Sequence, residues 1–526
     1  MKSTTTQPRR VIAASLFGYA GVAIQTVLML VLTPFVIRHV GLESFGVWAV
    51  VNGLLAFTSL LEAPSALAAI KYISRTNTHE SVGKIDRLVS NLLATQLGLA
   101  APVLVGVAIF AFGWPGLLSP DVELRGTARI ICLIVGGAIA VNFPLGLSKS
   151  LLAGMGRQVE VHVLGIIGSL LNAACVVGSL RAGFGLMGLS IAAAASLLLP
   201  GILAWFRVYR LLPSLRVSPR HCSRDQLCEL AGFGGASFVT NVAMTVVRRI
   251  DVLLLSGPLG LGAVAVFQVA ARVADQAQMF LCQLANALTP AMGELFGGDD
   301  SRRRAAWFLH GSLISLSLAI VPCIFLIMEA EDLLVWWVGQ EFLGAVVPLR
   351  ILAISLLIGC LEDHTGNVLS MGGRHRALAA YWVIIAVTKI VASLVLLPHW
   401  GLAAPAAGTL IASVIGKIFL AIPDALRLLR VTIVKYVRSV LMPTLIAAGM
   451  VVVLLIGMGP MATASLPSIL TRLIVAAYTF GVVFAFAGMP ADIRDSIWSG
   501  AIKLVRSETW RGVFSWDLFR RQKAEL

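Results

Sequence analysis

The sequence predicts an all-α polytopic membrane protein with about fourteen transmembrane helices, and three observations lead to this prediction. Only 13% of the 526 residues are charged and 58% are hydrophobic, whereas about 25% of the residues in a soluble protein are charged. Apolar stretches of about 20 residues, enough to cross a hydrocarbon core of about 30 Å, recur along the whole chain. Lys and Arg residues gather between alternate stretches, as they do in the cytoplasmic loops of membrane proteins.

The first element is a basic segment, 1–10, which we expect to be cytoplasmic. The apolar stretch from Val11 is too long for the core of a signal peptide, so we expect it to be retained as a helix. Division at charge clusters and Pro/Gly turns predicts spans at 11–37, 45–70, 88–112, 127–148, 158–180, 186–206, 232–256, 263–290, 305–328, 346–370, 378–397, 403–423, 439–458 and 468–488.

Loop charge supports an even number of spans. The segments DDSRRR (299–304) and GGRHR (372–376) are basic and lie on the expected inner side, whereas EAEDLLVWWVGQEF (329–342) is acidic and lies on the expected outer side. The C-terminus is basic as well, so both termini are expected to be cytoplasmic. The sequence therefore predicts a multi-pass membrane protein with both termini on the cytoplasmic side.

An internal repeat divides the chain into lobes. VGLESFGVWAVV (40–51) aligns with LGLGAVAVFQVA (259–270), GMGRQVEVHVLGIIGSLLN (154–172) with MGGRHRALAAYWVIIAVTK (371–389), and GLMGLSIAAAAS (185–196) with GLAAPAAGTLIAS (401–413). The displacement is about 217 residues, or six helices, which preserves orientation and predicts a parallel repeat about the membrane normal.

This repeat predicts the following organisation: an N-lobe at 11–206, a cytoplasmic inter-lobe loop at 207–231, a C-lobe at 232–423, an extra helix pair at 439–488 and an amphipathic cytoplasmic tail at 489–526. The extra pair has no repeat partner, and we expect it to carry no deep charge. The tail mixes Trp and Phe with basic residues, a pattern typical of a helix in the membrane interface.

Charges inside the spans are the candidates for a functional site, because each costs several kcal/mol unless it is paired or used. The segment VVRRIDVLLL (246–255) places Arg248, Arg249 and Asp251 in a single span. This concentration of charge is expected to serve either packing or ligand binding.

The next span carries a polar stripe. Gln268, Arg272, Asp275 and Gln276 recur at helical spacing and share one face, which cannot be turned to lipid. It is expected to line a wet cavity or a helix–helix contact. The candidates for a cationic cavity are Arg248, Arg249, Arg272, Lys389, Lys417, Gln268 and Gln276, and those for ion coupling are Glu62, Asp251 and Asp275.

Two interpretations of these charges stay open. Asp251 and Asp275 each lie three residues after an arginine, so each pair could lock helices together. Five deep cations nevertheless face these two anions, although Glu362 and Asp363 could take up part of the surplus. Residual positive charge in a low-dielectric cavity favours an anionic ligand, and the arginine fork fits phosphate.

Motifs for catalysis and metal binding are missing from the sequence. There is no GxxxxGK[ST], HExxH, GxSxG or paired CxxC motif, so we expect no catalytic residues, no cofactor and no ATP hydrolysis. His221, Cys222 and Cys228 form a weak ligand-like group, which we interpret as a plain loop rather than a zinc site. The net charge of +15 resides in short loops, so nucleic acid is not an expected partner.

Three segments resemble a known family. TPFVIRHVGLESFGVWAVVNGL (33–54), DVLLLSGPLGLGAVAVFQVAARV (251–273) and the segment LSMGGRHRALAAYWVIIAVTKIVASLVLLPHWGLAAPAAGTLIAS are similar to the polysaccharide-flippase (Wzx-like) branch of the multidrug/oligosaccharidyl-lipid/polysaccharide exporter superfamily. The resemblance covers about 11–423. It implies a protein of the bacterial inner (cytoplasmic) membrane. The implied activity is translocation of undecaprenyl-pyrophosphate-linked oligosaccharide from the cytoplasmic to the periplasmic leaflet by alternating access, for surface polysaccharide biosynthesis.

The resemblance also implies partners and alternatives. The partners would be lipid-linked oligosaccharide, membrane lipids and the polymerase and chain-length regulator of the same pathway, with coupling to a proton or sodium gradient. A lipid II flippase is the first alternative, but residues 11–25 lack the arginine that such flippases carry there. A multidrug antiporter of the same superfamily is the second, and it would require an acidic cavity.

Overall fold

The computed structural model describes residues 6–58, 66, 69–70, 72–73, 82–113, 122–218, 235–296, 300–459 and 465–485. These residues form helices joined by short turns, and none of them lies in a β-strand, which confirms the predicted all-α class. Ten segments within this part of the chain are long and apolar enough to cross a membrane. Every predicted span overlaps a helix, and the total of fourteen crossings stays a prediction.

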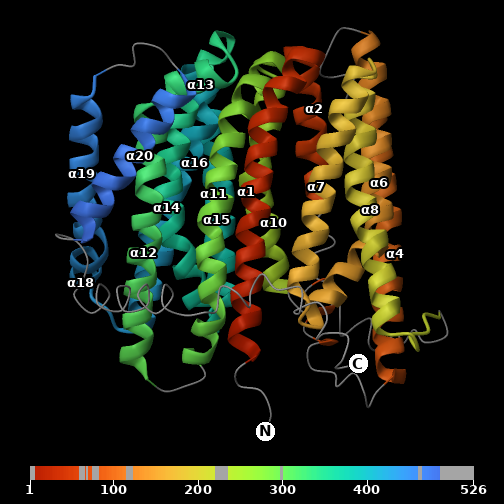
Figure 1. The fold of residues 1–526 in the computed structure, drawn as a ribbon, viewed down its shortest axis with the longest axis horizontal. Coiled ribbons are helices and arrows are strands. Elements are labelled where there is room, and N and C mark those ends of the chain that lie inside the picture. Colours follow the sequence, from red (N-terminus) through yellow and green to blue (C-terminus); the bar gives the residue numbers. More distant parts are fainter. Residues whose placement is uncertain are drawn as a thin grey trace.

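The first half of the chain forms a set of helices that we call the N-terminal helix group, on the right of Figure 1. It comprises α1 (Thr6–Val40), α2 (Leu42–Leu55), the 3₁₀ turn η1 (Ala56–Thr58), α4 (Val82–Gly113), α6 (Val122–Gly154), α7 (Gln158–Arg181) and α8 (Gly185–Leu211). Helices α6 and α8 pack together, with α4 on one side and α7 on the other, and α1 packs along α7.

The second set, the C-terminal helix group, is larger. It comprises α10 (Gly235–Ser256), α11 (Gly260–Phe296), α12 (Ser301–Met328), α13 (Ala330–Trp337), η3 (Gln340–Ala345), α14 (Val346–Met371), α15 (His375–Trp400), η4 (Gly401–Ala403), α16 (Ala404–Ser413), η5 (Val414–Ala421) and α17 (Ile422–Leu429). Helix α15 packs on α10 and α16, whereas α14 packs on α11, α12 and α16. The segment η5 is π-helical and joins α16 to α17 without a break.

The extra helix pair lies at the outer edge of the C-terminal helix group, at the far left of Figure 1. Short α18 (Ile433–Tyr436) and π-helical η6 (Val437–Leu441) lead into α19 (Met442–Gly457), and α20 (Leu466–Val483) packs back on α19 and α12. One charge of this pair is nevertheless buried within the protein, near the start of α20. Arg472 of α20 is 7% exposed and donates to Glu329 Oε1 at 2.7 Å. A buried ion pair therefore fastens α20 to the end of α12.

The three aligned sequence pairs share backbone geometry. The glycines that open the second helix of each group have φ of 81° (Gly41) and 79° (Gly260). The turns before α7 and α15 place Gly156 at 75° and Gly373 at 77°. A side chain strongly disfavours this left-handed region, so glycine is needed at each turn. The same bends thus recur at corresponding places in the two groups.

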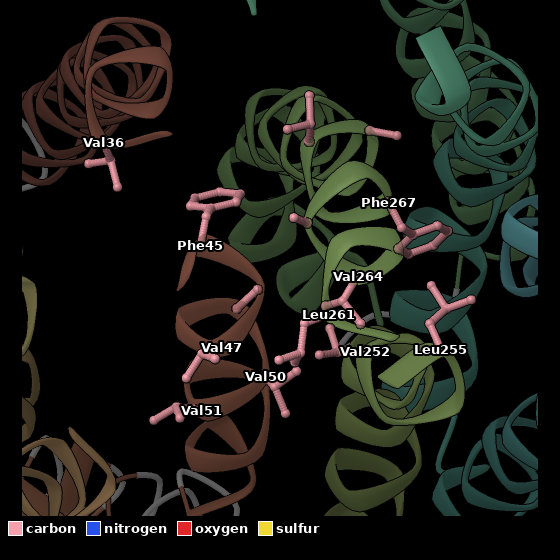
Figure 2. Close-up of a cluster of buried hydrophobic side chains, with 14 of the residues drawn as sticks. Val36, Phe45, Val47, Val50, Val51, Val252, Leu255, Leu261, Val264 and Phe267 are labelled. Carbon is pink, nitrogen blue, oxygen red and sulfur yellow. The ribbon is translucent and has the colours of Figure 1, made fainter. Parts of the chain in front are cut away.

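The two groups pack against each other through α1 and α2 on one side and α10 and α11 on the other. We call the end that carries the α1–α2 and α10–α11 turns the junction end. A Cβ on Gly46 would collide with the Leu261 carbonyl, so the absence of a side chain allows α2 to approach the start of α11. Figure 2 shows Val50 of α2 facing Val252 and Leu261, all within one buried apolar cluster that spans both groups.

Candidate functional site

Charged side chains deep in α10 and α11 remain partly exposed. Arg248 is exposed, and the side chains of Arg249 and Asp275 are 36% and 42% exposed. On α11, further from the junction end, Met279 and Phe280 are also exposed. Charges at this depth cannot face lipid, so these residues line a hydrated space. This charged face of α10 and α11 is the candidate site.

The aspartates do not pair within their own helices, contrary to the interpretation based on their spacing. Asp275 of α11 lies 3.6 Å from Arg249 Nη1 of α10, so this ion pair joins two helices. Asp251 pairs with Lys389 of α15 rather than with Arg248. Because the helices pack closely, each aspartate lies nearer to a cation of a neighbouring helix than to the arginine three positions before it in its own helix.

Lys389 and Asp251 form a closed structural pair. The ammonium lies 2.8 Å from the Asp251 carboxylate and also donates to the Val247 carbonyl. Lys389 is 2% exposed and Asp251 is 7% exposed. The pair therefore fastens α15 to α10, and neither side chain is open to a ligand in this arrangement.

Arg272 and Gln276 reach across the contact between the two helix groups. Arg272 Nη1 donates to Thr33 Oγ1 of α1 at 3.0 Å, and its guanidinium lies 4.9 Å from the centre of the Phe45 ring of α2. One turn further, Gln276 donates to Thr26 of α1 at 2.7 Å. The polar stripe thus holds α11 against the N-terminal helix group, while Gln268, also on α11, is half-buried.

A second polar cluster lies between α11, α14 and η5. Lys417, in the π-helical segment, is 3.8 Å from Glu362 of α14 and 5.4 Å from the ring centre of Trp382. The adjacent Asp363 accepts a weak hydrogen bond from the Cys282 thiol at 3.5 Å. π-Helical segments are frequent at functional sites because they reorient a side chain. The periodicity of the sequence could not predict this π-helical segment, because arguments from periodicity assume a regular α-helix.

These contacts change the charge balance of the site. Three of the five deep cations are paired with a carboxylate. Asp251 and Asp275 provide two of these carboxylates, and Glu362 provides the third. Arg248 and Arg272 have no ion pair within 4.0 Å among the residues that the structure describes. The face therefore retains a local positive excess centred on Arg248.

Some predicted features lie outside the described residues: Glu62, the group at His221, Cys222 and Cys228, and the tail at 489–526. Within the described ranges, no cluster of three or more His, Cys, Asp or Glu side chains could hold a metal ion.

Two curated relatives are similar to most of the chain. The chain is 23% identical to the probable flippase AglR of Haloferax volcanii over 79% of its length and 84% of the relative. It is 22% identical to a putative O-antigen transporter of Shigella flexneri, over 66% and 81% of the two chains.

The structural matches establish the fold. The lipid II flippase MurJ in an inward closed conformation superposes with a TM-score of 0.66 at 13% identity, covering 90% of this chain and 97% of MurJ. An inward-facing multidrug resistance MATE family transporter of the MOP superfamily gives 0.65 at 15% identity, covering 79% and 99%. These likenesses show the MOP-superfamily fold.

The family assignment rests on a match to the first lobe and the start of the second. The model of a family described as polysaccharide biosynthesis protein matches residues 13–296, more than half of the chain. This match includes α10 and α11, which carry the charged face, and the two segments at 33–54 and 251–273 that indicated the resemblance. The chain belongs to the polysaccharide biosynthesis protein family, and the Wzx-like resemblance is confirmed.

Proposed function

We propose that this protein is a flippase that translocates undecaprenyl-pyrophosphate-linked oligosaccharide from the cytoplasmic to the periplasmic leaflet of the inner membrane, for surface polysaccharide biosynthesis. The observation that carries the proposal is the exposed, positively charged face of α10 and α11 around Arg248 and Arg249. Pyrophosphate is the part of such a substrate that a buried positive potential recognises, because arginine offers planar, paired donors to phosphate oxygens.

Arg248 is the best placed of the predicted cations to meet the pyrophosphate. It is exposed and has no ion pair among the described residues, whereas Lys389 and Lys417 are buried beside carboxylates. Arg249 is held by Asp275 through a long contact of 3.6 Å. An incoming phosphate can compete for such a contact more readily than for the Lys389 pair at 2.8 Å.

Alternating access is supported by where the two helix groups meet. Their buried apolar contact lies at the junction end, which the loop charges predict to be periplasmic. A cavity closed at that end faces the cytoplasmic leaflet, where the lipid-linked substrate is assembled. Opening requires α1 and α2 to separate from α10 and α11 as units, since α1 also packs along α7.

The proposal can be tested in a deletion strain complemented with variants. Arg248→Ala should abolish surface polysaccharide and accumulate lipid-linked intermediate at normal protein levels, and Arg248→Lys should restore export in part. Losing one charged donor to phosphate weakens binding about tenfold or more. Arg181→Ala, an exposed arginine at the end of α7, is the matched control and should export normally.

Purified protein in vesicles separates the related functions. Translocation of pyrophosphate-linked oligosaccharide, with no translocation of lipid II or of cationic drugs, is the expected result. If the Arg248→Ala protein inserts stably and translocates at the wild-type rate, the cationic site is wrong. If lipid II is translocated in preference to oligosaccharide carriers, the substrate assignment is wrong.

A further inference from the structure

A separate pocket lies at the opposite end from the junction, within the C-terminal helix group. Its volume is about 280 Å³, and it is enclosed by the end of α11, the first turn of α12, the end of α14 and the end of α17. Its apolar walls are formed by Phe296, Met371, Leu428 and Leu429. The pocket does not contain any of the charges on the α10–α11 face.

One arginine lines this pocket together with the apolar side chains. The guanidinium of Arg304 lies 5.2 Å from the centre of the Phe296 ring. Its Nε is closed off from the surface and has no hydrogen-bond partner within the described part of the chain. An anionic ligand therefore meets the part of the Arg304 side chain that lines the pocket, where a charged hydrogen bond stabilises it. The hydroxyl of Ser301 is available beside it.

The rim of the pocket is strongly basic. Exposed cations lie in or beside the segments that line it: Arg302, Arg303, Arg376, Arg427 and Arg430. Of the described carboxylates there, Asp300 accepts from the Arg303 backbone N–H at 3.0 Å and Asp424 is paired with Arg374. The described cations outnumber these two carboxylates, so a positive excess lies beside the apolar side chains of the pocket.

We propose that this pocket binds an anionic phospholipid, with the headgroup phosphodiester on Arg304 and Ser301 and the start of an acyl chain against Met371 and Leu428. Basic pockets between transmembrane helices at the cytoplasmic side hold anionic headgroups in this way. A soluble phosphate would satisfy Arg304 but would leave the apolar walls uncovered. The combination of walls and charge fits an amphiphile better than a free anion. The inference does not depend on what the protein transports.

The test uses the purified full chain, stripped of lipid and then offered phosphatidylglycerol or phosphatidylcholine in mixed micelles, with retained lipid counted by native mass spectrometry. We expect preferential retention of phosphatidylglycerol, weakened about tenfold by Arg304→Ala. Met371→Trp keeps every charge but fills the pocket, and should lower retention comparably. Arg210→Ala, which removes an exposed arginine in the last turn of α8 in the N-terminal helix group, is the control and should retain lipid like the wild type.

Three outcomes overturn the proposal. They are equal retention of the two lipids, equal losses from Arg304→Ala and Arg210→Ala, and retention by Met371→Trp as strong as in the wild type. Inorganic phosphate distinguishes the sources of the phosphate group. A lipid site is expected to keep its phosphatidylglycerol when inorganic phosphate is added, whereas complete displacement by phosphate would show a site for a soluble anion.

Discussion

Replacing Arg272 by alanine should loosen the contact between the two helix groups at the junction end. The guanidinium makes two described contacts across this boundary: a hydrogen bond to Thr33 Oγ1 at 3.0 Å and a stacking contact with the Phe45 ring at 4.9 Å. Thr33 and Phe45 are each 0% exposed, so water cannot replace the lost donor without local opening. The substitution should therefore destabilise the arrangement in which the junction end is closed, without changing the open arrangement.

The size of the effect follows from these two contacts. A hydrogen bond from a charged donor contributes about 1.5–3 kcal/mol, and a partly desolvated cation–π contact contributes about 0.5–2 kcal/mol. Their loss removes about 2 kcal/mol or more from the closed arrangement. Since about 1.4 kcal/mol is a factor of ten, the equilibrium should move toward opening at the junction end by about thirtyfold or more.

Thiol accessibility in a cysteine-free background measures this shift. Val50→Cys places a probe at a position that is 0% exposed in the closed contact and faces Val252 and Leu261 (Figure 2). A membrane-impermeant maleimide added from outside should label it at least about tenfold faster when Arg272 is alanine. Thr33→Val removes the hydrogen bond but leaves the Phe45 contact, so it should give a smaller increase.

The same pair of variants separates closure from ligand binding. If Arg272 acts by holding the groups together, Thr33→Val should change labelling and transport in the same direction as Arg272→Ala. Unchanged labelling in a stably inserted Arg272→Ala protein that no longer exports would refute the closure argument. It would assign Arg272 to the ligand instead, as the polar stripe first indicated.

Three further predictions concern packing and topology. Lys389→Met should lower stability by about 3–5 kcal/mol, seen as a fall in Tm, because it leaves Asp251 buried without its partner; a double variant that also carries Asp251→Leu should recover most of the loss, and no recovery would contradict the pairing. Arg472→Leu should likewise destabilise the protein and increase protease cleavage between α19 and α20, and an unchanged cleavage rate would show that the ion pair does not hold α20. Alkaline phosphatase fused after Asp332 should be active and after Arg304 inactive, and the reverse pattern would overturn the predicted orientation.

The sequence predicted the helical class and the location of nearly every helix because apolar runs and turn residues are local signals. It also located the charged face, since a polar residue in an apolar span is visible without any partner. The partners themselves were not predictable. Lys389 and Asp251 are 138 positions apart, and only the packing of α15 on α10 brings them together.

Other misses share this physical origin. The buried state of Arg472 depends on Glu329, a residue assigned by sequence to an exposed loop. Lys417 turns toward Glu362 from a π-helical segment, where the regular periodicity of an α-helix does not apply. Sequence spacing thus showed which side chains are costly to bury. Tertiary contacts decided which of these side chains remained available to a ligand.

Near the turns that precede α7 and α15, each helix group carries an ion pair between consecutive helices. Glu160 of α7 accepts from Arg207 of α8 at 2.8 Å, whereas Arg374, at the start of α15, pairs with Asp424 of α17. Arg207 and Asp424 are 217 positions apart, the displacement of the repeat, so the later helix carries opposite charges at this place in the two groups. The arginine of the turn recurs as Arg157 and Arg374, and in the N-terminal helix group Glu160 binds both Arg157 and Arg207.

A chain with two similar halves risks pairing a helix with the wrong half while it inserts. Helix α8 placed beside α15 would bring Arg207 near Arg374 without a carboxylate between them, because Ala377 stands at the place of Glu160. This difference in charge therefore disfavours the mixed assembly. It also implies that chimeras exchanging α8 with α16–α17 should assemble poorly unless both members of the pair are exchanged together.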